Sequence, residues 1–203
     1  MGLIVKKLGR VAYEDAHRLQ KTAVTERADE TLSDDVLMLL EPEPVFTIGR
    51  GATDASLPTN SDLRVVESER GGDITWHGIG QLTGYWIRRL EGKERDLHRH
   101  LRLIEKQLIE ALRSLGIDAI RNDGLTGVWV EDRKIASIGV AVRRWVAYHG
   151  FSLNVDVDSA IYETFAPCGL DGAIMTDIST VLDRPVGLDE VIAAVTDAFS
   201  CNP

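Results

Sequence analysis

Cysteine is almost absent from this chain, and so are long hydrophobic runs. The 203 residues include two cysteines, Cys168 and Cys201, and none of the cysteines and histidines has the spacing of a zinc site. Because two such cysteines give no disulfide framework, we expect a reducing, cytoplasmic environment. No stretch approaches 18 apolar residues, and the first residues lack the apolar run of a signal peptide, so we expect no membrane partner and no metal.

Phosphate-binding motifs are missing as well. The chain has no Gly-x-x-x-x-Gly-Lys-Ser/Thr loop, and the glycines at 78–84 depart from Gly-x-Gly-x-x-Gly spacing, so no nucleotide cofactor is expected. A net charge of −9 argues against nucleic acid as a partner, because such binding depends on neutralising phosphates. Basic residues do cluster at 88–95, 99–102 and 143–144. Each cluster indicates either a solvated face or a docking patch for an acidic protein.

The spacing of apolar residues predicts an α+β fold. Helices are expected over 12–30, 97–115 and 188–199, and strands at 35–41, 45–48, 63–66, 82–87, 128–130, 135–142 and 146–155. Residues 70–81, rich in glycine, are expected to form a shaped loop without a strand. Because the strands are grouped and do not alternate with helices, we expect one domain over residues 1–203. Its sheet should be mainly antiparallel, with helices packed on it.

Cys168, in the run Ala-Pro-Cys-Gly-Leu, is the candidate nucleophile, since Cys201 lies where chain ends usually fray. A thiol attacks as its thiolate, a minor form at pH 7 for a pKa of roughly 8.5, so a working cysteine needs a cation or a base nearby. Lys134 is the candidate for that role. An inert, buried cysteine is the alternative. His77 and His149 are candidate bases or oxyanion donors, or else hydrogen-bonded structural residues.

Four ordered segments together resemble the octanoyltransferases of lipoate biosynthesis. They are Arg70-Gly-Gly-Asp-Ile-Thr-Trp-His-Gly-Ile-Gly-Gln-Leu82, Gly127-Val-Trp-Val-Glu-Asp-Arg-Lys-Ile-Ala-Ser-Ile-Gly139, His149-Gly-Phe-Ser-Leu-Asn-Val155 and Ala166-Pro-Cys-Gly-Leu170. The resemblance covers residues 10 to 199 and implies the catalytic module shared with biotin and lipoate-protein ligases. The chain departs from the family pattern at Ile79, Thr126 and Asp177, where proline, proline and serine are usual. Isoleucine at 79 removes a residue that fixes φ from its loop.

The resemblance implies an acyltransferase that moves an octanoyl group from octanoyl-acyl carrier protein to a lysine of lipoyl domains. It places the nucleophile, which carries the octanoyl thioester, at Cys168 and its catalytic partner at Lys134. It implies that the acyl group is bound by Arg70, Gly71, Gly72, Asp73, Ile74, Thr75, Trp76, His77, Ser137, Ile138, Gly139, Gly150, Phe151 and Ser152. No cofactor is implied, because a thioester donor is already activated.

Three alternatives stay open at this point. An octanoyl amidotransferase acting between lipoyl-type domains would share the cysteine chemistry and differ in its donor. An ATP-dependent lipoate-protein ligase would need no thiol. A non-catalytic binding module for lipoyl or acyl carrier domains would need neither Cys168 nor Lys134, so the presence of both residues favours the transferase.

Overall fold

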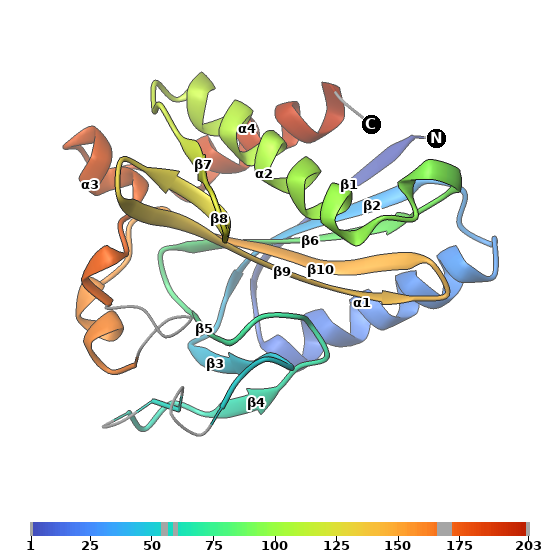
Figure 1. The fold of residues 1–203 in the computed structure, drawn as a ribbon, viewed down its shortest axis with the longest axis horizontal. Helices are drawn as coiled ribbons and strands as arrows, with labels where there is room; N and C mark the ends of the chain where they lie inside the picture. Colours follow the sequence, from blue (N-terminus) through green and yellow to red (C-terminus); the bar gives the residue numbers. More distant parts are fainter. Residues whose placement is uncertain (1, 54–56, 59–60, 166–171, 202–203) are drawn as a thin grey trace.

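A seven-stranded sheet forms the centre of the molecule in a computed structural model that describes residues 2–53, 57–58, 61–165 and 172–201 (Figure 1). The strand order is β1-β2-β6-β10-β9-β8-β7. The strands are β1 (Leu3–Val11), β2 (Asp35–Pro42), β6 (Gln81–Arg89), β7 (Ile120–Asn122), β8 (Leu125–Val130), β9 (Arg133–Arg143) and β10 (Val146–Asn154). Among the described strands of this sheet, β1 and β2 alone pair in parallel, which confirms the expected, mainly antiparallel arrangement.

A second, three-stranded sheet has the order β4-β3-β5, with β3 (Val45–Ile48), β4 (Val65–Glu67) and β5 (Ile74–His77). The expectation that residues 70–81 contain no strand is therefore wrong for 74–77. Antiparallel pairing with β3 satisfies the backbone of β5, and Ile74 and Trp76 are buried in a cluster with Tyr162 and Phe165. The glycines flank the strand and do not interrupt it.

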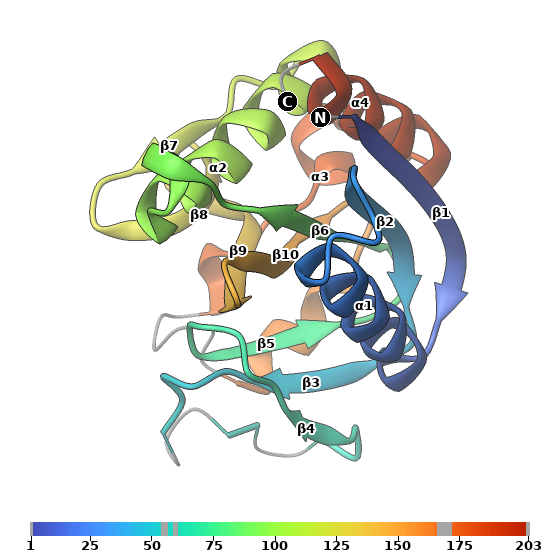
Figure 2. The same cartoon turned by 90° about the vertical axis from the view of Figure 1, so that its right-hand side faces the viewer.

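The helices cover the large sheet on both faces. Helix α1 (Tyr13–Ala28) lies on the same side as the small sheet, while α2 (Leu97–Ser114) and α4 (Leu188–Cys201) lie on the other (Figures 1 and 2). Strand β2 is buried by helices on both of its faces. Val36, Met38 and Leu40 pack against α1, whereas Leu37 and Leu39 pack against α2 and α4. Successive residues of a strand face opposite sides, so a strand covered on both sides is apolar throughout.

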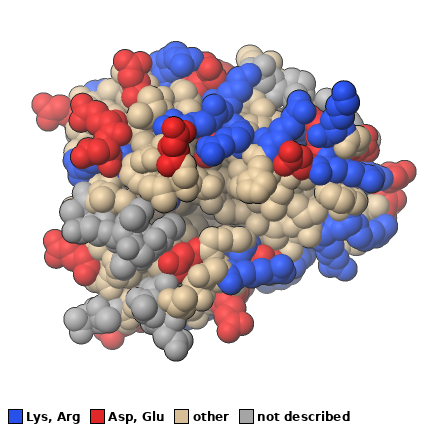
Figure 3. Space-filling model, viewed as in Figure 1, with Lys and Arg blue, Asp and Glu red and all other residues tan. Residues whose placement is uncertain are grey.

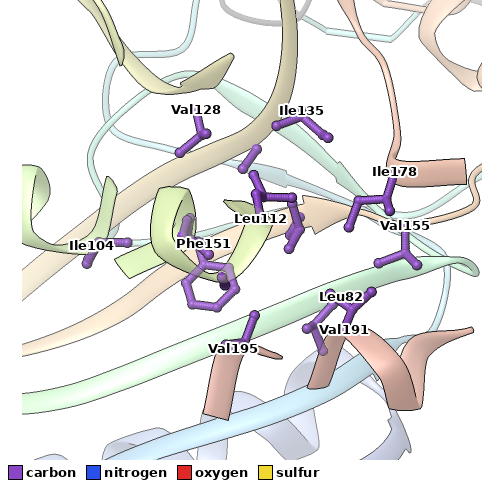
Figure 4. Close-up of a cluster of buried hydrophobic side chains, with 14 of the residues drawn as sticks. Leu82, Ile104, Leu112, Val128, Ile135, Phe151, Val155, Ile178, Val191 and Val195 are labelled. Carbon is purple, nitrogen blue, oxygen red and sulfur yellow. The ribbon is translucent and has the colours of Figure 1, made fainter. Parts of the chain in front are cut away.

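The larger core lies under α2 and α4, where Ile104, Leu112, Val191 and Val195 meet the sheet (Figure 4). The Asp96 carboxylate caps the start of α2, because it accepts from the amide of Arg99. Sequence reasoning did not identify β1, β7 or the short α3 (Ile178–Leu182). Three 3-10 turns complete the described elements: η2 (Gly92–Glu94), η3 (Ser159–Glu163) and η5 (Gly172–Ile174).

Candidate active site

A cavity lies between the small sheet and strands β9 and β10 of the large sheet. It contains about 350 Å³ of empty space, counted with the solvent at its mouth. Nine of the fourteen expected binding residues line it: Arg70, Thr75, His77, Ser137, Ile138, Gly139, Gly150, Phe151 and Ser152. A smaller neighbouring cavity shares three of these residues and adds Ile74 and Trp76. The structure thus brings three segments, distant in sequence, to one place.

Gly71, Gly72 and Asp73 line neither of these cavities and instead fasten the loop behind their wall. The amide of Gly71 donates to the carbonyl of Val140 at 2.9 Å, which ties the loop to β9. A Cβ on Gly139 would lie 2.9 Å from the carbonyl oxygen of Gly71, so the two backbones meet with no space for a side chain. Gly72 has a φ of +84°, a conformation that glycine adopts without strain.

The side chain of Arg70 anchors the loop at residues 70–73 by hydrogen bonds. It is buried and donates to the backbone carbonyls of Thr47 and Asp73, both at 2.8 Å, and to the Thr47 hydroxyl. The guanidinium fork therefore joins β3 to the turn before β5. A lysine could not make the same set of hydrogen bonds, because it lacks the planar fork.

His77 belongs to a buried network of neutral groups. Its Nδ1 lies 3.0 Å from Oε1 of Gln81, and its Nε2 lies 3.2 Å from Oγ1 of Thr47. Because Gln81 offers an oxygen there, Nδ1 carries the proton and Nε2 accepts from the Thr47 hydroxyl. Burial and the charge of Arg70 lower the pKa of His77 to about 3. The ring is neutral at pH 7 and acts as a structural link, not as a tuned base.

His149 has a left-handed backbone conformation, with a φ of +59°. This turns its amide towards α1, where it donates to Gln20 Oε1 at 2.9 Å, and the ring stacks on His17 and Tyr148. Burial and the nearby His17 lower the pKa of His149 to about 3. The low pKa values of His77 and His149 favour a structural role for both residues, because a base with so low a pKa is weak at neutral pH.

Glu69 is a residue of this region that the sequence did not reveal. Its carboxylate accepts from Lys21 and from Tyr148, and it lies 3.1 Å from His17 Nε2 and 3.7 Å from His149 Nε2. The ligand atoms of Glu69 and the two histidines could hold a metal ion. The Lys21 ammonium on the same carboxylate opposes that, because a second cation would have to displace it.

Lys134 is buried in β9, opposite Trp129 of β8. Its ammonium lies 5.7 Å from the centre of the Trp129 ring, within the range of a cation–π contact. Gly127 leaves room for it, because a Cβ at that position would lie 2.7 Å from Lys134 Cε. The expected catalytic lysine is therefore held by packing on β8.

Cys168, the expected nucleophile, lies outside the described residues. The chain on both sides of residues 166–171 is placed beside the same site. Phe165 and Met175 line the smaller cavity, and Met175 forms a parallel bridge with Lys134. The amide of Thr176 also donates to the carbonyl of Lys134 at 3.0 Å. Cys201, by contrast, is an exposed free thiol at the end of α4.

None of the helices within the described residues is long and apolar enough to span a bilayer.

Comparison with known proteins identifies the family. The lipoyl protein ligase A/B catalytic domain family matches residues 12–200. An octanoyltransferase of Geobacter metallireducens is 43% identical over 197 residues, which are 97% of this chain and 92% of that protein. Among solved structures, lipoate-protein ligase A bound with ATP has a TM-score of 0.76 at 17% identity, covering 98% of this chain and 85% of the other. Biotin protein ligase of Aquifex aeolicus has a TM-score of 0.56 at 13% identity, covering 100% and 68%.

The two structural likenesses confirm the expected ligase-type fold and, at such low identity, speak of the fold alone. The sequence relationship identifies the family, because it extends over nearly the whole of both chains at 43% identity. The chain is thus an enzyme of the lipoyl protein ligase A/B catalytic domain family, and within that family it belongs to the octanoyltransferases.

Proposed function

We propose that this octanoyltransferase moves an octanoyl group from octanoyl-acyl carrier protein to a lysine of a lipoyl domain, through a thioester on Cys168. The observation that carries the proposal is the bridge between Lys134 and Met175. It places the chain that follows the Cys168 segment against the strand that bears the buried lysine. Phe165, three residues before Cys168 in the sequence, lines a cavity that shares Ser137 and Ser152 with the larger one.

The chemistry has two steps. In the first, the Cys168 thiolate attacks the carbonyl carbon of the donor thioester, the carbon–sulfur bond to the carrier breaks, and the carrier leaves as a thiol after taking a proton. In the second, the ε-amine of the acceptor lysine attacks the new thioester, the bond to Cys168 breaks, and an amide forms. Exchange of one thioester for another is nearly isoenergetic, and amide formation from a thioester is downhill, so the cycle needs no ATP.

Lys134 serves both steps in this scheme. As an ammonium it stabilises the Cys168 thiolate, and as a neutral amine it takes a proton from the incoming lysine. The contacts with Trp129 and Gly127 support these roles, because they fix the lysine in one position beside β8. A fixed cation lowers the cost of forming the thiolate more than a mobile one does.

The larger cavity would bind the octanoyl chain. Gly139 and Gly150 let the backbone of β9 and β10 form the wall directly. Residues 137–139 are half-buried in the middle of a strand whose flanking residues are buried. Ser137 and Gly139 share one face of this strand and line the cavity, so the partial exposure of these two residues is expected of a binding wall.

Intact-mass measurements in two stages test the proposal. Octanoyl-acyl carrier protein should add one octanoyl group to the enzyme, and a lipoyl domain added afterwards should remove it and gain the same mass. The same assay separates the alternatives. An octanoyl-lipoyl domain that loads the enzyme better than the carrier would favour an amidotransferase, and product from ATP with free octanoate would favour a ligase. The absence of any adduct or product would favour a non-catalytic module.

A further inference from the structure

A third cavity lies away from the proposed acyl site, where the chain passes from the end of β6 through η2 into α2 (Figure 1). Its charged and polar lining residues are Arg88, Glu94, Arg99, His100, Arg102 and Lys106. The cavity contains about 820 Å³ of empty space, counted with the solvent at its mouth. It shares no lining residue with the two cavities beside β9 and β10.

The lining contains four cations and one carboxylate. Arg88 is bound to Glu94 at 3.0 Å, and Arg102 is bound to Glu105 at 2.8 Å. Within the described part of the chain, Arg99 and Lys106 are exposed and form no ion pair. Figure 3 shows lysine and arginine atoms gathered over this side of the molecule. An acidic protein therefore has a locally basic hollow.

The buried carboxylates around this hollow already bind arginine side chains. Asp35, behind Arg88 at 3.5 Å, is also hydrogen-bonded to Arg27. Glu105 accepts from Arg121 as well as from Arg102. Each buried carboxylate thus faces two guanidinium groups, and neither compensates the charge of Arg99 or Lys106. The positive charge of the hollow remains in excess.

His100 gives an independent sign of a ligand. The side chain is 3% exposed, and both ring nitrogens lack a hydrogen-bond partner within the described residues. Its ring packs on Trp86 with a centroid distance of 5.3 Å. Burial and the charge of Arg88 lower the pKa of His100 to about 4, so the ring is neutral at pH 7 and offers one N–H donor. Buried polar groups almost always have a partner, and this one lines the hollow.

We propose that this cavity binds an organic phosphate that carries at least two negative charges, with Arg99 and Lys106 on its phosphate oxygens and His100 donating from the floor. Guanidinium and ammonium groups together recognise phosphate through charge-assisted hydrogen bonds. Two cations without ion pairs match two negative charges. The lining residues Leu90 and Leu103 offer apolar contact to the carbon part of such a molecule.

The depth of the site favours a small molecule over an acidic protein surface. His100 is almost fully buried, and the side chain of Arg88 is only 9% exposed. A broad protein surface would reach the exposed Arg99 and Lys106 at the rim and leave the His100 ring without a partner. A small phosphate compound can enter the hollow, which all three residues line.

Calorimetric titration of the full chain with inorganic pyrophosphate, at an ionic strength of about 0.15 M, tests the proposal. One saturable site is expected. The double substitution Arg99→Gln with Lys106→Gln should weaken binding by about tenfold or more, because two charge-assisted contacts are lost. The matched control is Lys6→Gln with Lys7→Gln, which removes the same charge from exposed positions on β1. Its affinity should stay within about twofold of the wild type, since remote exposed charges are screened.

A second measurement reads His100 directly. The imidazole ¹⁵N resonances of His100, assigned with a His100→Phe variant, should shift when pyrophosphate binds to the wild type. They should not shift in the Arg99→Gln, Lys106→Gln protein. Should the phenylalanine variant fail to fold, substitution of the other histidines in turn gives the same assignment.

Three results would overturn the proposal: no saturable binding, equal affinity in the two double variants, or binding of an acidic protein without binding of pyrophosphate. Octanoyl loading, measured on the same samples, reports separately on the proposed transferase chemistry.

Discussion

Gly127 and Lys134 compete for one volume of space. A Cβ on Gly127 would lie 2.7 Å from Cε of Lys134 and 3.4 Å from its Nζ. The glycine therefore allows the lysine side chain to lie against β8, where its ammonium faces the Trp129 ring. Gly127 begins the segment that resembles the octanoyltransferase motif and contains Lys134, the proposed catalytic lysine. The missing Cβ of the glycine leaves room for that side chain.

Substitution of Gly127 by alanine should therefore slow the formation of the octanoyl-enzyme. The added methyl would displace the Lys134 amine, and a shift of about 1 Å at a catalytic group costs about a hundredfold in rate. Some stability should also be lost, because Gly127 has a φ of +140° and the methyl would lie 2.7 Å from the carbonyl of Ala136.

The matched control is Gly124→Ala in the neighbouring turn. Its φ of +86° carries a similar backbone penalty, but nothing lies within 4 Å of the added Cβ. Single-turnover loading, followed by mass, separates the two effects. Equal loading rates in the two variants would show that the packing of Lys134 does not matter for catalysis.

Two substitutions of Lys134 separate its proposed roles. Lys134→Arg keeps a positive charge but cannot lose its proton, so loading of octanoyl should persist while transfer to a lipoyl domain stalls. Lys134→Ala should lose both, because the Cys168 pKa returns towards roughly 8.5 and the acceptor lysine stays charged. Loading and transfer should be timed separately, after circular dichroism has shown that each variant is folded. An alanine variant with wild-type rates would remove Lys134 from the mechanism.

Gly139→Ala tests the contact between the loop at 70–73 and β9. The new Cβ would meet the carbonyl oxygen of Gly71 at 2.9 Å and Arg70 Cδ at 3.2 Å, so the loop must move away from the cavity wall. We expect a loss of about 1–3 kcal/mol in the free energy of unfolding and slower octanoyl loading. Gly187→Ala, where nothing lies within 4 Å, is the control. Loading that is unchanged in Gly139→Ala would place the acyl group elsewhere.

Protonation of His77 should destabilise the folded protein in acid. Its folded-state pKa of about 3 lies below the ordinary value of 6.5, so the unfolded chain binds the proton more readily. The stability that the neutral ring provides is complete above pH 6.5 and is lost as the pH falls towards 3. Denaturant unfolding between pH 7 and 4 should give a shallower pH dependence for His77→Asn than for the wild type. Replacement of the exposed His98 by asparagine should leave the wild-type slope, and an identical slope in His77→Asn would contradict this account.

The sequence predicted those elements whose apolar residues repeat regularly. Helix α2 follows the spacing of Ile104, Leu108 and Leu112, which are all buried. Strand β1 escaped prediction because its apolar and polar residues do not alternate regularly; it lies at the edge of the sheet, and none of its residues is fully buried. Strand β5 escaped because its glycine-rich flanks outweighed four residues whose strand conformation depends on pairing with β3.

The candidate site, like the fold, could be predicted from the sequence only in part. The motifs around Arg70, Ser137 and Gly150 could be identified in the sequence as separate segments, and the structure brings them to one cavity. The cluster of Glu69 with His17 and His149 could not be predicted, because its members come from α1, β10 and the loop before β5, which meet only in the folded chain. Nor could sequence show that burial leaves His77 and His149 neutral, since a pKa depends on surroundings that the fold creates.

The site of acylation tests the central claim most directly. The enzyme should be mixed with octanoyl-acyl carrier protein, digested and mapped by peptide mass, in parallel with Cys168→Ser and Cys201→Ser variants. We predict one octanoyl group on the peptide that contains Cys168, its removal by hydroxylamine, full loading of Cys201→Ser and no turnover by Cys168→Ser. An octanoyl group on Cys201, or a Cys168→Ser enzyme that still transfers octanoyl at the wild-type rate, would contradict the account.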